Sequence, residues 1–202
     1  MTKKNKVARM KLNGCCPSVN DRSPIVPPTI PITLTSGPIF RNVNTDFIAV
    51  SVQNVTDSPQ TVTVSVLNWQ NTCDPEEFPK FGFLCGNLVN GTDDSVTTQQ
   101  ENGDDIFFPP DVPGVVTPFT FTIPARQLFT IQAWPTSPVS PPNPIYEVRV
   151  TVPPQPIVPP GPVFPPPPVN VNTWGISASG QIQEGNRVLD HQFRRIAPPN
   201  RI

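Results

Sequence analysis

Four cysteines are the residues of this chain with the clearest capacity for chemistry. Cys15 and Cys16 are adjacent, and Cys73 and Cys85 follow twelve positions apart from each other. Neighbouring cysteines rarely bond to each other, because their Cβ atoms diverge along an extended backbone. Each member of the first pair can therefore bond to a separate partner, and we expect Cys15 and Cys16 to form intermolecular disulfides rather than to remain idle thiols. Cys73 and Cys85 either close an internal disulfide loop or stay reduced.

Catalysis has little support in the residue pattern. His191 is the only histidine and stands beside Asp190, but a triad also needs a nucleophile aimed at the base, and no G-x-S-x-G sequence is present. The acidic residues lie mostly in polar stretches, where a raised carboxyl pKa is not expected. The sequence therefore predicts that the protein is not an enzyme, has no catalytic residue and needs no cofactor.

Metal binding is not predicted either. The cysteines show no C-x2-C spacing, and the single histidine is remote from them. Two stretches, 90–94 (NGTDD) and 102–105 (NGDD), carry the oxygen ligands that calcium prefers. They lack EF-hand spacing, and such clusters are typical of turns.

Composition limits the classes of partner. The 202 residues suffice for one domain, charged residues make up 14%, and the net charge is −1. This balance does not favour binding to nucleic acid or to a membrane surface, and no apolar run reaches the roughly twenty residues needed to span a bilayer. The N-terminus, MTKKNKVARMKLNGCC, lacks the apolar region of a signal peptide. We therefore expect synthesis in the cytoplasm without a signal peptide.

The chain divides into a tail and one domain. Residues 1–29 are expected to form an extended basic connector, because five of the fourteen basic residues fall in the first eleven positions and four prolines follow. Residues 30–202 are expected to form one β-domain. The tail either contacts a polyanion or docks on the acidic 74–111 segment of a neighbouring copy, and the second arrangement would give a head-to-tail contact.

Alternating apolar and polar residues predict strands throughout the domain. The alternation at 48–52 and 62–66, with turn residues at 54–59 between them, predicts a β-hairpin. Further strands are expected at 30–43, 119–123, 128–134 and 146–152, and a closing hairpin at 169–176 and 188–196 around Ser179-Gly180. Because no segment shows a helical period, the predicted fold is all-β: an antiparallel β-sandwich or jelly roll with proline-rich loops.

Two segments depart from this pattern. Residues 70–115 hold nine acidic residues against the single basic Lys80, and we expect an acidic insertion there. Residues 153–168 (PPQPIVPPGPVFPPPP) are expected to run as polyproline II, either as a spacer or as a ligand for an aromatic groove.

The Cys15-Cys16 pair and the strands behind it resemble a known family. The stretch FIAVSVQNVTDSPQTVTVSVLNW, at 47–69, and the later YEVRVTV look like spore-surface proteins of spore-forming Firmicutes. The whole arrangement resembles their endospore appendage subunits, which join an N-terminal connector bearing Cys-Cys to a jelly-roll domain and lack a signal peptide. This chain is longer than those subunits.

The resemblance implies a structural role. It implies that Cys15 or Cys16 bonds to Cys73 or Cys85 of another copy, which competes with an internal Cys73–Cys85 bridge. The expected partners are copies of the chain or other spore-surface proteins, and the expected location is the spore surface, reached after lysis of the mother cell. Lysis would also expose the thiols to oxidation, which the reducing cytosol opposes.

A second hypothesis is a non-enzymatic binding module whose loops recognise a glycan, a cell-wall polymer or a partner protein. Trp69, Trp134 and Trp174 would then be the aromatic platforms. Exposed, coplanar tryptophans would favour this hypothesis, and buried ones would weaken it.

Overall fold

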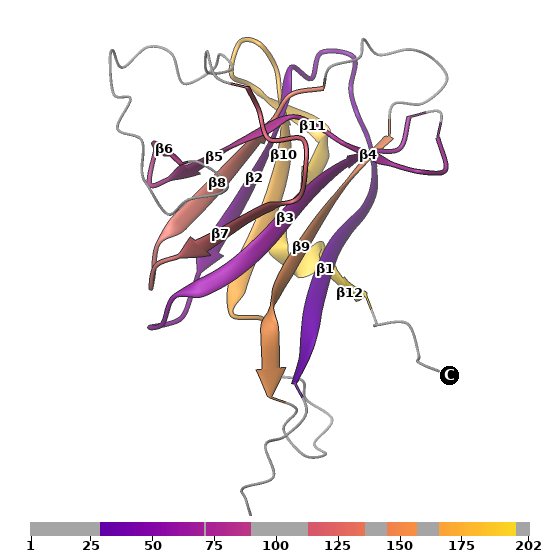
Figure 1. Ribbon diagram of the computed structural model, residues 1–202. Helices are drawn as coiled ribbons and strands as arrows, with labels where there is room; N and C mark the ends of the chain where they lie inside the picture. Colours follow the sequence, from indigo (N-terminus) through magenta and orange to yellow (C-terminus); the bar gives the residue numbers. More distant parts are fainter. Residues whose placement is uncertain (1–28, 71, 90–112, 136–144, 157–165, 197–202) are drawn as a thin grey trace, which may run out of the picture.

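A computed structural model describes residues 29–70, 72–89, 113–135, 145–156 and 166–196 (Figure 1). These residues form twelve strands and one short 3-10 helix, and no α-helix occurs among them. The strands are β1 (Thr29–Phe40), β2 (Phe47–Asn54), β3 (Gln60–Asn68), β4 (Glu76–Glu77), β5 (Lys80–Leu84), β6 (Asn87–Val89), β7 (Phe119–Ile123), β8 (Leu128–Ala133), β9 (Ile145–Pro156), β10 (Val169–Ile176), β11 (Ile182–Val188) and β12 (Arg194–Ile196), and the helix is η1 (Asp190–Gln192).

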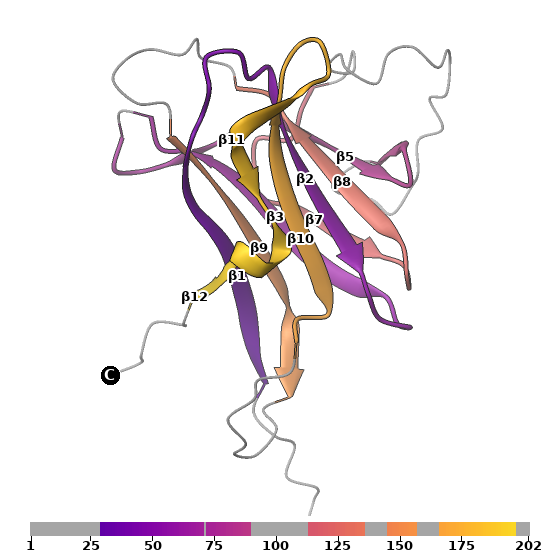
Figure 2. The ribbon, with the colours of Figure 1, turned by 180° about the vertical axis from the view of Figure 1, so that it is seen from behind.

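The strands build two antiparallel sheets that pack face to face (Figures 1 and 2). Sheet A has the order β12–β1–β9–β3, and both β7 and β4 pair with the far side of β3. Sheet B has the order β11–β10–β2–β8–β5–β6. From β1 to β9 the chain passes back and forth between the two sheets, and β4 is an additional short strand of sheet A. As a result, the strands β1–β9–β3–β7 of sheet A face the strands β2–β8–β5–β6 of sheet B. The predicted all-β sandwich is confirmed, and this strand order is that of a jelly roll.

Period-two alternation explains the core. The valines of β2 and β3 are fully buried, and so are Phe129 and Ile131 of β8. In strands, successive side chains point to opposite faces, so these residues all meet between the sheets. Phe121 of β7 stacks on Phe129 across the core, with ring centroids 4.8 Å apart. Gly82 of β5 is required here, because an added Cβ would lie 2.6 Å from the Phe119 ring.

The predicted hairpin at 48–66 is wrong in its pairing, although both of its strands form. β2 belongs to sheet B, where it pairs with β8 and β10, and β3 belongs to sheet A, where it pairs with β7 and β9. The segment 55–59 therefore crosses between the sheets as an arch. The alternation turns the valines inward in either arrangement, so it does not distinguish a hairpin from two strands that face each other across the core.

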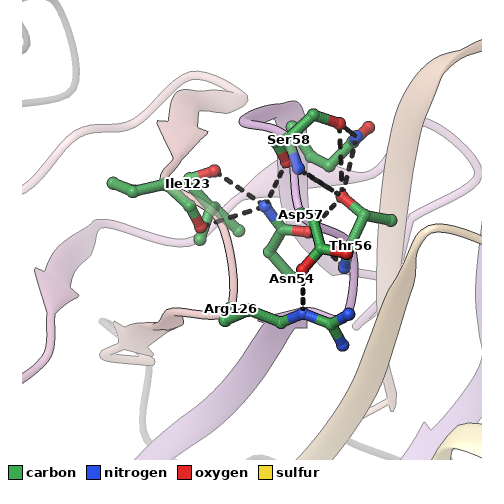
Figure 3. Close-up of polar contacts among 8 residues, drawn as sticks. Asn54, Thr56, Asp57, Ser58, Ile123 and Arg126 are labelled. Atoms are coloured by element: carbon green, nitrogen blue, oxygen red, sulfur yellow. Dashed lines mark hydrogen bonds and ion pairs between the residues drawn. The ribbon is translucent and has the colours of Figure 1, made fainter.

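The side chain of Asn54 holds this arch (Figure 3). Its amide nitrogen donates to the carbonyl oxygens of Ser58, Ile123 and Pro124, and its oxygen accepts from the backbone and hydroxyl of Thr56. The β2–β3 arch is thereby bonded to the β7–β8 arch, which also crosses between the sheets.

A closing hairpin around Ser179-Gly180 forms as predicted, but its second strand is β11, at Ile182–Val188, and not the expected 188–196. β10 pairs with β11, and Ser177–Gln181 form the connection. The rest of the expected strand, after Val188, contains η1 and β12. The chain passes here from sheet B to sheet A, where β12 pairs with β1. His191 accordingly lies in η1 and not in a strand.

Part of each unusual segment belongs to the sandwich. β4, β5 and β6 lie within 70–115, so residues 76–89 are integral to the sheets, whereas 90–112 lie outside the described residues. Residues 153–156 continue β9 and pair with β1, which corrects the polyproline II prediction for that stretch. The pairing of β9 with β3 stops at Thr151, because Pro153 and Pro154 offer no N–H to the ladder. Residues 157–165 lie outside the described part.

The sandwich has two distinct ends. Thr29, where the described chain begins, pairs with Pro156 at the end that also carries the two arches; we call this end the connector pole (Figure 1). At the opposite end, Phe40 pairs with Ile145, and the backbone N–H of Trp69 donates to the carbonyl of Ile145. The β1–β2 and β3–β4 connections lie at this second end, which we call the loop pole.

Candidate functional site: cysteines, buried charges and tryptophans

The cysteines predicted to cross-link divide into two groups. Cys15 and Cys16 lie in 1–28, outside the described residues. Cys73 and Cys85 are described, and both are exposed and free of disulfides.

Cys85 occupies an unusual backbone position. The pairing of Leu84 with Asn87 leaves Cys85-Gly86 as a two-residue hairpin turn, with φ of 50° and 88°. Turns with two positive φ values favour Asn, Asp or Gly, and the left-handed conformation costs an ordinary residue about 1–2 kcal/mol. The thiol lies 3.9 Å from both the Gln127 side-chain oxygen and the Leu128 carbonyl, so it makes only weak contacts. A reactive side chain is thus presented at an exposed tip where a different residue would be more stable.

Cys73 lies in the β3–β4 connection at the loop pole. The hydroxyl of Thr72 accepts a hydrogen bond from the backbone of Asp74, which fixes the chain around the cysteine. Asp74 and Glu76 are also exposed, so the thiol stands in an acidic loop.

The internal Cys73–Cys85 bridge is not formed in this structure. The β3–β4 connection and the β5–β6 turn lie on opposite sides of the sandwich (Figures 1 and 2). The extended strand β5 alone carries Cys85 about 16 Å away from Lys80. Because a disulfide needs Cα atoms within about 7 Å, the two thiols are placed for separate partners.

A buried ion pair that no local sequence pattern indicates joins the two sheets. Lys80 of β5 is fully buried, and its Nζ lies 2.7 Å from Oε2 of Glu77, in β4 of sheet A. The same Nζ donates to the carbonyl of Thr117, and the same carboxylate accepts from the N–H of Val66 in the gap between β4 and β7. Burial lowers the pKa of Lys80, and the hydrogen bond and charge of Glu77 oppose this shift. Lys80 and Glu77 therefore neutralise each other and bond to backbone groups at the edge of sheet A.

Glu147 heads a second polar cluster, on the outer face of sheet A. Although burial opposes its ionisation, hydrogen bonds from Arg149, Thr35 and Trp69 prevail and lower the pKa of Glu147. Arg149 also lies over the Trp69 ring, 5.9 Å from its centroid. The cluster contains no nucleophile. Its hydrogen bonds join β1 and β9 to the β3–β4 connection.

The three tryptophans do not form a common platform. Trp69 is held by Glu147 and Arg149 beside sheet A. Trp134, which follows β8, stacks on Phe47 and meets the edge of Phe81. Trp174 is half-buried in β10, and its side chain makes no ring contact or hydrogen bond within the described residues.

The remaining chemical candidates are separated or committed. His191 is exposed, and the carboxylate of its neighbour Asp190 accepts the N–H of Val171 instead of orienting the imidazole. In the described parts of the chain, no three His, Cys, Asp or Glu residues are grouped to hold a metal ion. The same parts contain no helix with the length and hydrophobicity that crossing a membrane requires. The stretches 90–94 and 102–105, considered for calcium, lie outside the described residues.

Comparison with protein-family models, with curated proteins and with solved structures found no match to this chain.

Proposed function

We propose that the protein is a structural subunit that assembles with copies of itself into a spore surface layer or appendage fibre. The subunits are joined through the N-terminal connector, residues 1–29, and through intermolecular disulfides. The observation that carries the proposal is the placement of Cys73 and Cys85 as two exposed, unbonded thiols on opposite sides of the sandwich. Each thiol is available to a cysteine of another copy, and Cys15 and Cys16 supply two such cysteines per chain.

The two poles favour head-to-tail assembly. The chain enters the sandwich at Thr29 on the connector pole, and Cys16 precedes it by thirteen residues. Thirteen extended residues reach at most about 45 Å. Cys73 stands at the loop pole of the next copy, which a stacked arrangement brings towards that connector. A contact between two different surfaces repeats without limit unless it closes into a ring, so it suits a fibre.

Charge supports the same arrangement. The connector carries five basic residues in its first eleven positions, and the Cys73 loop presents the exposed side chains of Asp74 and Glu76. Opposite charges steer encounter between surfaces and fix their orientation.

The bond itself requires an oxidant. Two thiols lose two protons and two electrons to form one disulfide, and dioxygen accepts them and becomes hydrogen peroxide. In this proposal, lysis of the mother cell supplies the oxidising environment after assembly has begun. Other spore-surface proteins with free thiols are alternative partners. Catalysis, nucleic-acid binding and membrane binding have no part in the proposal.

Electrophoresis and electron microscopy test it. Purified protein exposed to air is expected to give a ladder of species without reductant and one monomer band with dithiothreitol. Negative-stain images are expected to show elongated assemblies that shorten or disperse on reduction. A single monomer band under both conditions, with no assemblies in the images, would refute the proposal.

Serine variants identify the bonds. The double variant Cys15→Ser/Cys16→Ser is expected to abolish the ladder, and so is Cys73→Ser/Cys85→Ser. The single variants Cys73→Ser and Cys85→Ser show which thiol accepts the connector. A ladder that persists in the second double variant would mean that the connectors bond only to each other.

A further inference from the structure

The outward-facing side chains of β2, β8 and β10, on the outer face of sheet B, carry no charge. In β2, β8 and β10, the residues that alternate with the buried core point away from it. The registers align them in three rows across the strands, which we call the sheet-B outer face: Gln132–Ala49–Trp174, Thr130–Ser51–Asn172 and Leu128–Gln53–Asn170. None of these nine residues is ionisable. The nearest charge along the first row is Arg187, on the edge strand β11.

The outer face of sheet A provides a contrast. Its threonine hydroxyls are bonded to one another across the strands, in the pairs Thr33–Thr151, Thr61–Thr122 and Thr63–Thr120. Its charged groups, Glu147 and Arg149, are paired as well. These hydroxyl and charged groups are therefore already bonded to one another within the sheet.

On the sheet-B outer face several polar groups are not bonded to one another. Within the described residues, the side chains of Ser51, Gln53 and Thr130 make no hydrogen bond, although they are neighbours in the array. Asn172 uses its oxygen to accept the N–H of Asp190, and this bond leaves its amide nitrogen available. Amide and hydroxyl groups both donate and accept hydrogen bonds, so these side chains can bind a ligand rich in hydroxyl groups.

An aromatic ring and an apolar side chain border these groups. Trp174 is half-buried, and its neighbour across the strands is Ala49, which has a small side chain. Leu128, at the other end of the array, is 45% exposed. Binding sites for small neutral ligands combine aromatic surface with a few polar groups that fix orientation.

We propose that the sheet-B outer face binds a neutral polysaccharide chain, with Trp174 as the stacking platform and Ser51, Gln53, Thr130 and Asn172 as hydrogen-bonding groups. A neutral glycan offers hydroxyl groups to the polar rows and C–H surfaces to the indole. An anionic ligand would find no cation within the array. A protein partner would be expected to meet more exposed apolar surface than Leu128 and Trp174 provide. This role is separate from the assembly proposed above, since it uses no cysteine and neither pole.

Calorimetry with the full-length, reduced protein tests the proposal, because dithiothreitol keeps it from cross-linking. The probes are the hexasaccharides of N-acetylglucosamine and of glucose. The wild type is expected to bind at least one of them, and Trp174→Ala and Thr130→Arg are each expected to weaken that binding by about tenfold or more. Because Trp174→Ala removes a half-buried side chain, Ser51→Arg provides a second variant that obstructs the face from β2, and it too is expected to weaken binding.

Thr61→Arg is the matched control, since it places the same side chain on the outer face of sheet A. It is expected to bind the sugar as the wild type does. Absence of binding by the wild type at millimolar sugar, or unchanged binding by both arginine variants on sheet B, would overturn the proposal. Loss of self-assembly in Thr130→Arg, without sugar binding by the wild type, would assign the face to a second copy and also overturn it.

Discussion

Asn54 is expected to be the most important polar side chain for the stability of this sandwich. It is fully buried, and it makes five hydrogen bonds of 2.8–3.1 Å that join the two arches (Figure 3). Asn54→Ala leaves the buried Ile123 carbonyl without this donor, which costs about 1–3 kcal/mol. The other four bonds are partly exposed, so water can replace them, and they add about 0.5 kcal/mol each. The expected total loss is about 3–5 kcal/mol, a large part of a typical domain stability of about 5–15 kcal/mol.

Asn54→Asp separates hydrogen bonding from size. The variant keeps the shape but places a buried carboxylate among three carbonyl oxygens, so at neutral pH it should be less stable than Asn54→Ala. The folded state must raise the pKa of this new carboxyl above its unfolded value of about 3.9. The folded state then binds the proton more tightly than the unfolded state does. The loss of stability caused by the buried charge is therefore absent below the unfolded pKa, and it grows as the pH rises through the folded pKa.

Urea unfolding followed by circular dichroism, in reductant, measures both variants at pH 7 and near pH 4. Asp57→Asn is the control from the same arch, because it removes the Asp57–Arg126 ion pair, whose side chains are 87% and 62% exposed. Its unfolding midpoint is expected to match the wild type, since exposed ion pairs contribute little. The reasoning fails if Asn54→Ala unfolds with the wild type, or if Asn54→Asp is no worse than Asn54→Ala at neutral pH.

Four further outcomes follow from single residues. Cys85→Asn should raise the free energy of unfolding by about 1 kcal/mol, because Asn tolerates the φ of 50° ahead of Gly86; urea unfolding in reductant measures it, and no gain would contradict the strain argument. Burial lowers the pKa of Lys80, so the unfolded chain binds more protons and the free energy of unfolding should rise as the pH rises towards 10.5. Lys80→Met should lack this rise, and parallel profiles of stability against pH would disprove it. Glu77→Gln should destabilise more than Lys80→Met, because it leaves a fully buried ammonium without its counter-charge, and equal urea midpoints would contradict this. Tyr146 is the only tyrosine, and burial raises its pKa well above the usual value; alkaline titration at 295 nm should show tyrosinate only as the protein unfolds, and an earlier change would exclude that burial.

Local patterns predicted most strands of this protein. Alternation at 119–123 predicted β7 with its observed bounds, and alternation at 146–152 predicted the first part of β9, which extends on to Pro156. Short strands escaped prediction, because β4 and β6 have two and three residues and offer no period to recognise. An excess of acidic residues also made 70–115 look like a single insertion, although Lys80 and Glu77 neutralise each other inside it.

The candidate sites were predictable only as residue types. The sequence identified Cys73 and Cys85, but left open whether they bond to each other, since twelve positions of separation permit either result. Their placement on opposite sides follows from the extended β5 between them. Similarly, Trp69, Trp134 and Trp174 looked equivalent in the sequence, and only the contacts of Trp69 and Trp134 separate them from Trp174.

The sequence by itself determined which residues face the core, because a period of two fixes the sides of a strand regardless of its partner. Tertiary structure alone decided which strands pair. β2 and β3 have the alternation of a hairpin, yet they lie in opposite sheets, because Asn54 bonds the crossing segment to the β7–β8 arch and β8 and β9 supply the partners. Hydrogen bonds between residues roughly seventy positions apart leave no mark on the local pattern, so the choice between a hairpin and an arch is decided only in the folded structure.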